Sequence, residues 1–499
     1  MTTENGESNS IHERSSIGPS HLKKTSDEEL LRIKNSFLAL LSKDQNPIKD
    51  LEGTCIMSSE DLDPYRLIGD SAIDHILKLL QSENSKLGAM EDFILMGEKA
   101  TATDPLTRTP SQAAMSDFLT KYKTLPKWAD KEQLKRGQEV FLAYAPVCGL
   151  SLFYRSLVPG FSIPKINAVI QATAYLAPPS TPDQSLQRII DTGELLSACM
   201  SLGIESLTEP DGVGWKTAIY VRILHAKVRY ALLQRTGKRK WDVEKYGIPI
   251  NQEDLAATLL AFSVNVLVGI DMISGSSLSD EERTDYLALW RYIGWLLGVE
   301  TETDTRTKGE PDTKELPPLD PCGPPRKDDV CKNTIQRSYA LLESIIFHLG
   351  DPDDSSVRIA HHLLQITDRK PPKDIQNVLS FYKNGLFYYR SLQCRKLIGE
   401  PLANALELPF HPNVWKRALI YATSAFVWSV LRVYTLASMY SPFCRKTLVG
   451  FHSRQFVNFH NYWNQTHTSK MADMARKRVS NKINQSNMCP FAMVAPPNN

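Results

Sequence analysis

Apolar residues recur three and four positions apart along most of the chain, which is the pattern of helices that bury one face. The clearest run is Trp215–Gln234, WKTAIYVRILHAKVRYALLQ, which holds no Gly or Pro. Leu255–Met272 and Glu281–Leu297 repeat the pattern, and SLSDEER at Ser277–Arg283 has the Ser and acidic residues of a helix start. Alternating, strand-like runs are scarce. The sequence therefore predicts an all-α fold.

One segment interrupts the helical pattern. Residues 301–330 contain six prolines and many charges, as expected of a linker or surface excursion and not of a packed element. The helical pattern resumes at Ser338–Gly350. We predict a disordered tail over 1–27, one large helical domain over 28–478 with the Pro-rich excursion inside it, and a loose tail over 479–499.

Two windows are apolar enough to raise the question of a membrane. Leu255–Ile273 is broken by polar residues, and Ala418–Leu431 is shorter than the roughly 20 residues that a span needs. We expect both to be buried helices, with peripheral membrane contact left open for the second. The polar N-terminus lacks the apolar stretch of a signal peptide.

The composition narrows the class of protein. The chain has 499 residues, 42% of them hydrophobic, and 58 Lys+Arg against 56 Asp+Glu. That size allows a sizeable core, and the near-zero charge argues against a nucleic-acid partner, which requires clustered Lys and Arg. None of the eight cysteines forms a CxxC pair, so we expect a reduced chain in the cytoplasm, with association to the endoplasmic reticulum (ER) as the alternative.

The sequence lacks the motifs of several common binding sites and enzymes. GVGWKT at Gly212–Thr217 lacks the spacing of a phosphate-binding loop, and there is no GxGxxG, HExxH or GxSxG motif. No histidine has a Glu three residues before it, so a ferritin-like di-iron site is excluded.

His225 is the candidate that remains. Arg222 and Arg229 lie three residues before and four residues after it, on the same helical face. An imidazole between two guanidiniums suits haem, because the iron takes an axial imidazole and the propionates take cationic partners. The alternative is a core histidine bonded to a backbone carbonyl, with both arginines in ordinary ion pairs.

The other histidines are weaker candidates for a metal or cofactor ligand. The neighbours His361 and His362 point to different helix faces and cannot easily serve one site. His452, His460 and His467 lie eight and seven residues apart, and we interpret them as polar surface or interface residues.

The chain resembles the catalytic domain shared by latex-clearing proteins (rubber oxygenases) and fungal ER-bound oxygenases of the mycophenolic-acid type. The resemblance rests on DGVGWKTAIYVRILHAKVRYALL, WDVEKYGIPINQEDLAATLLAFSVNVL and YLALWRYIGWLLGVE. LPKWADKEQLKRGQEVF and RKLIGEPLANALELP agree as well, so it covers roughly residues 90–410.

This resemblance implies an all-α fold that holds b-type haem in a buried cavity between helices. The family's VRxxHA histidine, its proximal iron ligand, falls on His225. An Arg and a Thr near the distal side of the haem fall on Arg188 and Thr192, and a pocket-lining Thr falls on Thr258. Arg222 and Arg229 are the expected partners of the propionates.

The chain departs from the family pattern at three points. Latex-clearing proteins carry a Lys just before the distal Thr, where this chain has Asp191, which cannot supply a neutral amine to the iron. Their proposed catalytic acid has no clear match, since Asp183 is the only acidic residue in Ser162–Arg188. We also expect this chain to lack the N-terminal anchor of the ER-bound members.

The resemblance thus implies a haem-dependent oxygenase that uses dioxygen to cleave or oxidise an apolar, isoprenoid-like or secondary-metabolite substrate. One alternative is oxidation without cleavage of a C=C bond. Another is a helical binding or scaffolding protein that keeps the fold without the activity. The sequence predicts no oligomeric state.

Overall fold

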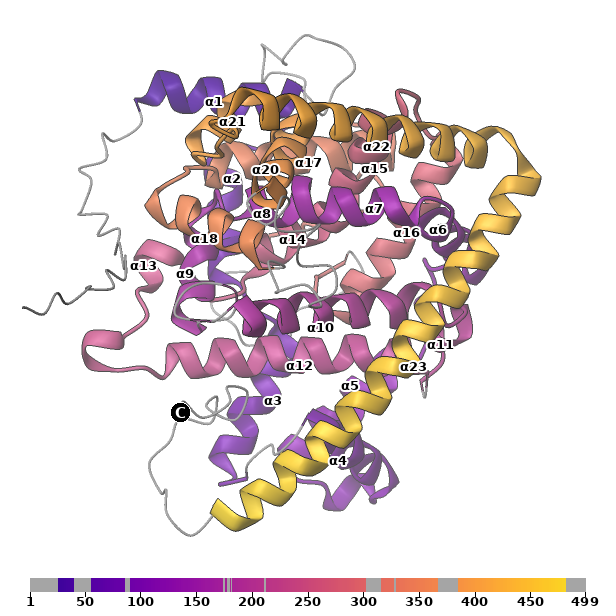
Figure 1. The fold of residues 1–499 in the computed structure, drawn as a ribbon. Coiled ribbons are helices and arrows are strands. Elements are labelled where there is room, and N and C mark those ends of the chain that lie inside the picture. Colours follow the sequence, from indigo (N-terminus) through magenta and orange to yellow (C-terminus); the bar gives the residue numbers. More distant parts are fainter. Residues whose placement is uncertain are drawn as a thin grey trace, which may run out of the picture.

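The protein folds as a layered set of helices (Figure 1). The structure is a computed structural model that describes residues 26–39, 55–85, 90–173, 176, 180, 182–210, 212–301, 316–326, 329–366 and 385–481, with side chains of the last helix described to Tyr462. Every regular element in these residues is helical, so the predicted all-α fold is confirmed.

The helices are, in chain order, α1 (Asp27–Ala39), α2 (Ser59–Leu62), η1 (Asp63–Leu67), α3 (Ser71–Ser82), α4 (Met90–Ala102), η2 (Pro105–Thr107), α5 (Pro110–Tyr122), α6 (Lys131–Ala143), α7 (Ala145–Ser151), η3 (Leu152–Leu157), α8 (Val158–Gly160), α9 (Pro164–Thr173), α10 (Pro182–Met200), α11 (Ile204–Thr208), α12 (Val213–Leu233), η4 (Gly237–Arg239), α13 (Val243–Tyr246), α14 (Gln252–Phe262), α15 (Val264–Ser274), α16 (Asp280–Leu296), α17 (Thr334–Leu349), α18 (Asp354–Gln365), α20 (Gly385–Ile398), α21 (Glu400–Ala405), α22 (Val414–Tyr440) and α23 (Pro442–Asn481).

The strongest helical patterns in the sequence form the centre of the molecule. α12 and α16 match the predicted helices closely, and α16 begins with a capping box in which the Ser279 side chain accepts from the Glu282 N–H. The predicted helix Leu255–Met272 is instead two helices, α14 and α15, which meet at Ser263. The Ser263 hydroxyl donates to the Leu259 carbonyl, and its backbone (φ −104°, ψ −77°) departs from ideal helix geometry.

The second half of the Pro-rich segment is packed into the protein, which differs from the expected surface excursion. Leu319, Asp320 and Cys322 are buried, and Asp320 accepts hydrogen bonds from Arg291 on α16. Residues 302–315 lie outside the described part. Helices on either side of the segment pack together, α16 against α17. The predicted tails also fall outside the described residues, apart from Ser26, the start of α1 and the last turn of α23.

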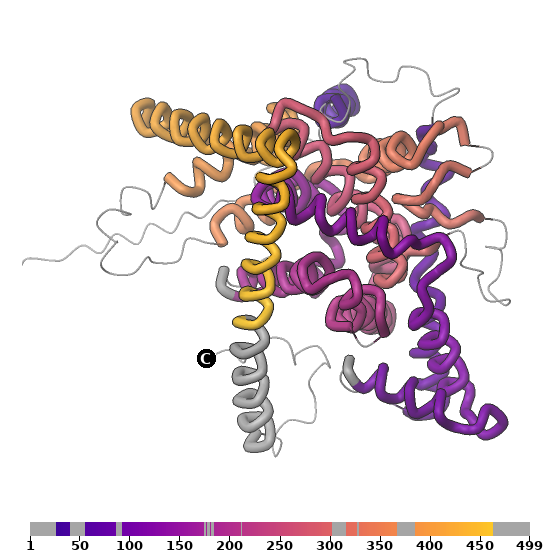
Figure 2. Tube along the Cα trace, turned by 90° about the vertical axis from the view of Figure 1, so that its right-hand side faces the viewer, coloured from indigo at the N-terminus to yellow at the C-terminus, as the bar shows by residue number. Residues whose placement is uncertain are grey.

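The expected burial of Ala418–Leu431 is wrong. This window forms the middle of α22, a helix on the outside of the molecule that meets α23 at an elbow (Figures 1 and 2). Three small polar side chains are its buried residues: Ser424, Thr435 and Ser438. Mean apolarity could not reveal this arrangement, because it does not record which side of a helix meets the protein.

Two helical stretches of the described chain are long and apolar enough to cross a membrane, or three if the bent pair Lys131–Ala143 and Ala145–Gly160 counts as one span. Gln252–Ser274 is 72% buried inside the protein, so its apolarity serves the core. Val414–Tyr440 is 11% buried.

A disulfide joins Cys55, which precedes α2, to Cys331, which precedes α17. Their Cα atoms lie 5.4 Å apart although 276 positions separate them in the sequence. The expectation of a fully reduced chain is therefore wrong at this pair. A search for closely spaced cysteines could not find it, because the fold brings the two together.

We expect Cys55→Ser to lower the thermal midpoint of unfolding, since the cross-link restricts the unfolded chain and such bonds contribute roughly 2–5 kcal/mol. Circular dichroism during a thermal ramp measures the midpoint. Cys444→Ser is the matched control, because Cys444 is unpaired in the structure. Equal midpoints for both variants, or for the parent protein with and without reductant, would contradict the prediction.

Candidate functional site

The helix that carries His225 is fixed by glycines at its start. A Cβ at Gly212 would lie 2.1 Å from the Ser206 carbonyl oxygen, and one at Gly214 would lie 2.7 Å from that of Ala198 on α10. Trp215 follows, fully buried, and its Nε1 donates to the Tyr122 carbonyl at 2.8 Å. The Gly-x-Gly-Trp sequence is thus a packing motif that presses α12 against α10 and α11.

His225 lies deep among the helices, but its side chain is only partly covered by other residues. Burial, together with the nearby Arg229 charge, lowers its pKa to about 4, while Asp70 acts against this shift. The imidazole is therefore neutral at physiological pH and has a lone pair to offer. Its side chain is only partly covered, and its Nδ1 is buried with no hydrogen-bond partner. A deep but incompletely covered ring with an orphaned nitrogen is expected of a ligand facing an interior space.

Two other helices share this incomplete coverage: α10, which packs against α12, and α14. Every residue of α10 from Leu186 to Leu196 is half-buried, although an amphipathic helix normally alternates buried and exposed positions. On α14, Thr258 is exposed while Leu255–Ala257 and Leu259–Leu260 are buried. Thr258 is thus like His225 in being accessible within a helix whose neighbouring positions are buried.

Arg188, Asp191 and Thr192 lie together on α10. Arg188 Nη1 is 3.5 Å from Asp191 Oδ2, and the other Asp191 oxygen accepts from Gln187 at 3.0 Å. Thr192 donates its hydroxyl proton to the Arg188 carbonyl at 3.0 Å, and Thr258 donates to the Asp254 carbonyl at 2.8 Å. Both threonines therefore have their protons engaged and present oxygen lone pairs.

Arg222 forms a buried ion pair, which is the alternative that the sequence left open beside a role as propionate partner. It forms a two-point ion pair with Asp70 on the loop before α3, with Nε–Oδ2 at 2.6 Å and Nη2–Oδ1 at 2.8 Å. Both side chains are buried, and the guanidinium also lies over the Tyr122 ring. Burial alone would raise the pKa of Asp70, but Arg222 outweighs it and holds the pKa below its usual value.

Arg229 also forms an ion pair with an aspartate near the start of α3. Its Nε lies 2.7 Å from Asp74 Oδ2 on α3, and its Nη1 donates to the Ile250 carbonyl at 2.8 Å. Nη2 is buried without a hydrogen-bond partner, so this guanidinium keeps one donor unused. The ordinary ion pairs that sequence reasoning left open hold for both arginines.

One pair on α10 had no sequence signal. Glu194 bonds to His460 Nδ1 on α23, 266 residues away, and burial raises the pKa of Glu194 although His460 opposes the shift. Its second oxygen, Oε2, is buried without a hydrogen-bond partner. His452 is half-buried with an unpartnered Nδ1, while the side chain of His467 lies outside the described part.

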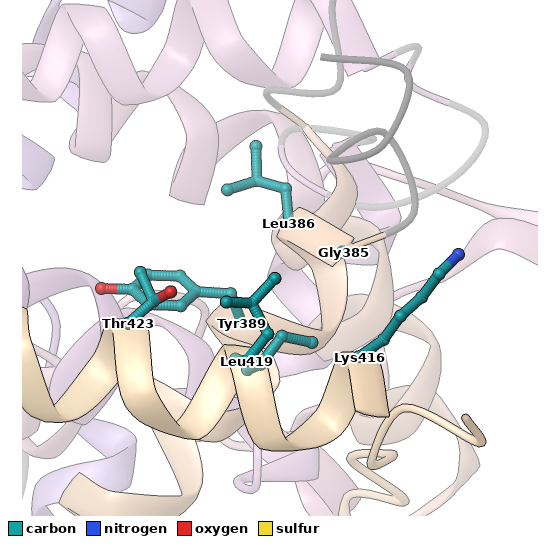
Figure 3. A pocket seen from close by; sticks show the side chains of 7 residues that line it. Gly385, Leu386, Tyr389, Lys416, Leu419 and Thr423 are labelled. Atoms are coloured by element: carbon teal, nitrogen blue, oxygen red, sulfur yellow. The ribbon is translucent and has the colours of Figure 1, made fainter. Parts of the chain in front are cut away.

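A separate pocket lies between α20 and α22 (Figure 3). It measures about 170 Å³ and is lined by Gly385, Leu386, Tyr389, Lys416, Leu419, Ile420 and Thr423. None of the residues discussed around His225 belongs to it. We therefore treat it as a different feature from the candidate site.

Within the described residues, no group of three or more His, Cys, Asp or Glu side chains could hold a metal ion. The fold and the site define an all-helical protein that carries a deeply placed, neutral histidine, His225, on a central helix. The comparisons agree with this class. Residues 177–431 match the family described as ER-bound oxygenase mpaB/B′/rubber oxygenase, catalytic domain, and the chain belongs to this family.

Among solved structures the chain is similar to latex clearing protein in its closed state, at 16% sequence identity and a TM-score of 0.47. The match covers 79% of this chain and 91% of the other. No curated protein sequence matches significantly.

We expect Gly214→Ala to lower the free energy of unfolding by about 1–3 kcal/mol, because the added methyl group would overlap the Ala198 carbonyl. Chemical denaturation measures the change. Gly149→Ala is the control: it also lies in a helix, its added methyl group meets no atom within 4 Å, and alanine favours helix. Equal effects of the two substitutions would show that the contact is not required.

We expect Asp70→Asn to cost about 3–5 kcal/mol of unfolding free energy, because it leaves the Arg222 charge buried and unpaired. The double variant Asp70→Asn/Arg222→Met should lose clearly less than the sum of the two single variants. Glu98→Gln, which breaks a surface pair with Lys123, should change the value by about 1 kcal/mol or less. Additive single effects would contradict the coupling.

Proposed function

We propose that the protein is a haem b-dependent oxygenase in which His225 would hold the iron. The observation that carries the proposal is the state of His225: neutral, deep within the helices, partly uncovered and with an orphaned Nδ1. Membership of an oxygenase family supports it. Bound haem would supply the activation of dioxygen, chemistry that protein side chains lack.

The chain's own residues would then do three things. His225 would hold the cofactor. Arg229, four residues further along α12, would donate a hydrogen bond from its unused Nη2 to a propionate. On α10, Arg188 would provide positive charge where negative charge develops on oxygen, with Asp191 orienting it. Thr192 and Thr258 would contribute acceptor oxygens, because their protons are engaged by backbone carbonyls.

Asp191 stands where latex-clearing proteins have a Lys, which changes the ligands that this chain could offer to iron. A carboxylate paired with Arg188 and bonded to Gln187 has no neutral amine to place on the iron. We therefore propose that this protein has no lysine-ligated resting form. The half-buried apolar residues of α10, such as Ile189 and Leu195, favour an apolar substrate, and no described charge pattern around them calls for a polyanion.

We also propose that the helical domain of residues 28–478 acts as one unit and associates with the ER. The disulfide supports an oxidising compartment over the cytoplasm, and the family description includes ER-bound members.

The test is the absorption spectrum of the protein expressed with added haem. We expect a Soret band in the parent protein and its loss, with loss of co-purified haem, in His225→Ala. His452→Ala is the matched control, because that histidine also has a buried, unpartnered Nδ1 but lies on α23. Full haem retention by His225→Ala would overturn the assignment, and absence of the band in the parent would favour a binding or scaffolding role.

Labelled dioxygen distinguishes the two oxidations. Cleavage of a C=C bond by a dioxygenase places label in both carbonyl products, whereas oxidation without cleavage leaves the carbon chain intact. Mass spectrometry of the products of an isoprenoid test substrate reads the difference.

A further inference from the structure

The fully buried residues of α22 are polar, and most of its apolar side chains are exposed. A surface helix normally turns its apolar side inward, yet the buried residues of α22 are Ser424, Thr435 and Ser438. The Ser438 hydroxyl donates to the Ala143 carbonyl, and Ser424 accepts from Gln393 and Lys396 on α20. The helix is thus attached to the body through these hydrogen bonds and through Trp428, Leu431 and Met439, which are half-buried against the core.

The opposite side of α22 is apolar and exposed. Trp415 is 85% exposed, Phe426 is 70% exposed, and Val433 and Tyr440 continue the same side of the helix at spacings of seven and seven. Spacings of this kind return to nearly the same angular position, so these side chains form one continuous band. Phe443, which is 80% exposed, extends the band past the elbow into α23. We call this set the outer band.

The charge around the outer band has one sign. Residues 408–472 contain seven Lys and Arg and no Asp or Glu, although the whole chain is nearly neutral. Arg445 is engaged by Glu282 from α16, whereas Arg432, Lys446 and Arg454 lie exposed beside the band. An apolar band with Trp and Tyr, flanked by cations, has the composition of a helix that lies in the interface of an anionic bilayer.

Two other occupants fit less well. A symmetric dimer through this face would place two identical cationic, acid-free surfaces against each other, which repel. A transmembrane orientation would require α22 to leave α15 and α20, against which it packs, and to carry its hydrogen-bonded serines into lipid.

We propose that the outer band is a membrane-docking surface for anionic lipid, with α22 and the start of α23 lying flat in the bilayer interface. This goes beyond the proposed oxygenase activity and does not depend on haem. The pocket between α20 and α22 adjoins the N-terminal half of this surface (Figure 3). Its lining is largely apolar, with Lys416 among its residues, and its volume of about 170 Å³ suits the end of a hydrocarbon chain with an anionic group nearby.

The test is co-sedimentation of the full-length protein with vesicles of phosphatidylcholine that contain about 30% phosphatidylserine. We expect binding that weakens with salt and is at least about tenfold weaker with pure phosphatidylcholine vesicles. The triple variant Trp415→Ser/Phe426→Ser/Phe443→Ser should lose binding about tenfold or more, because these side chains are exposed and their loss leaves the fold intact.

Charge is tested separately. Lys446→Glu/Arg454→Glu should weaken binding to the anionic vesicles about tenfold. The matched control Lys238→Glu/Arg239→Glu, an exposed basic pair on η4, should bind as the parent does, as should Leu106→Ser, an exposed apolar residue on η2.

Three results would overturn the proposal. They are equal loss of binding in the η4 control, protein that stays in the vesicles after alkaline carbonate extraction, and a dimer in light scattering that Phe426→Ser dissociates. The first would mean unspecific charge attraction, the second a span and the third a second copy.

Discussion

The buried ion pair between Arg222 and Asp70 is the constraint on which the candidate site depends. Two charges taken out of water are stable only when geometry satisfies both, and this pair has two short contacts and an aromatic ring beneath it. It ties the middle of α12 to the start of α3. Three residues along α12, His225 is therefore held in a set orientation, and Arg229 repeats the attachment one turn further on.

This arrangement shows what sequence reasoning could and could not say about α12. Helical periodicity places Arg222, His225 and Arg229 on similar sides of α12, so all three looked available to one cofactor. The deciding partners, Asp70 and Asp74, precede them by about 150 residues and carry no local signal. Helix positions, caps and the Gly-x-Gly-Trp packing motif are local, and they could be predicted; the partners of charged side chains are long-range, and they could not.

The same limit applies to α22. Its hydropathy is that of a core helix, and only the position of its three buried polar residues shows that the apolar side faces outward. The net charge of the whole chain does not reveal that acidic residues are unevenly distributed along it. Its balanced total coexists with a stretch from residue 408 to residue 472 that has no acidic residue, so the average says little about any one surface.

The disulfide has a consequence for how the chain is made. Cys55 leaves the ribosome 276 residues before Cys331, a delay of roughly 14–55 s at typical rates of synthesis. Cys148, Cys199 and Cys322 emerge in that interval as competing thiols. Once their helices and loops pack, burial raises the pKa of Cys199 and Cys322 to about 12 and that of Cys148 further, so that little reactive thiolate forms. Packing of the intervening helices therefore favours the pairing of Cys55 with Cys331 over pairing with these thiols.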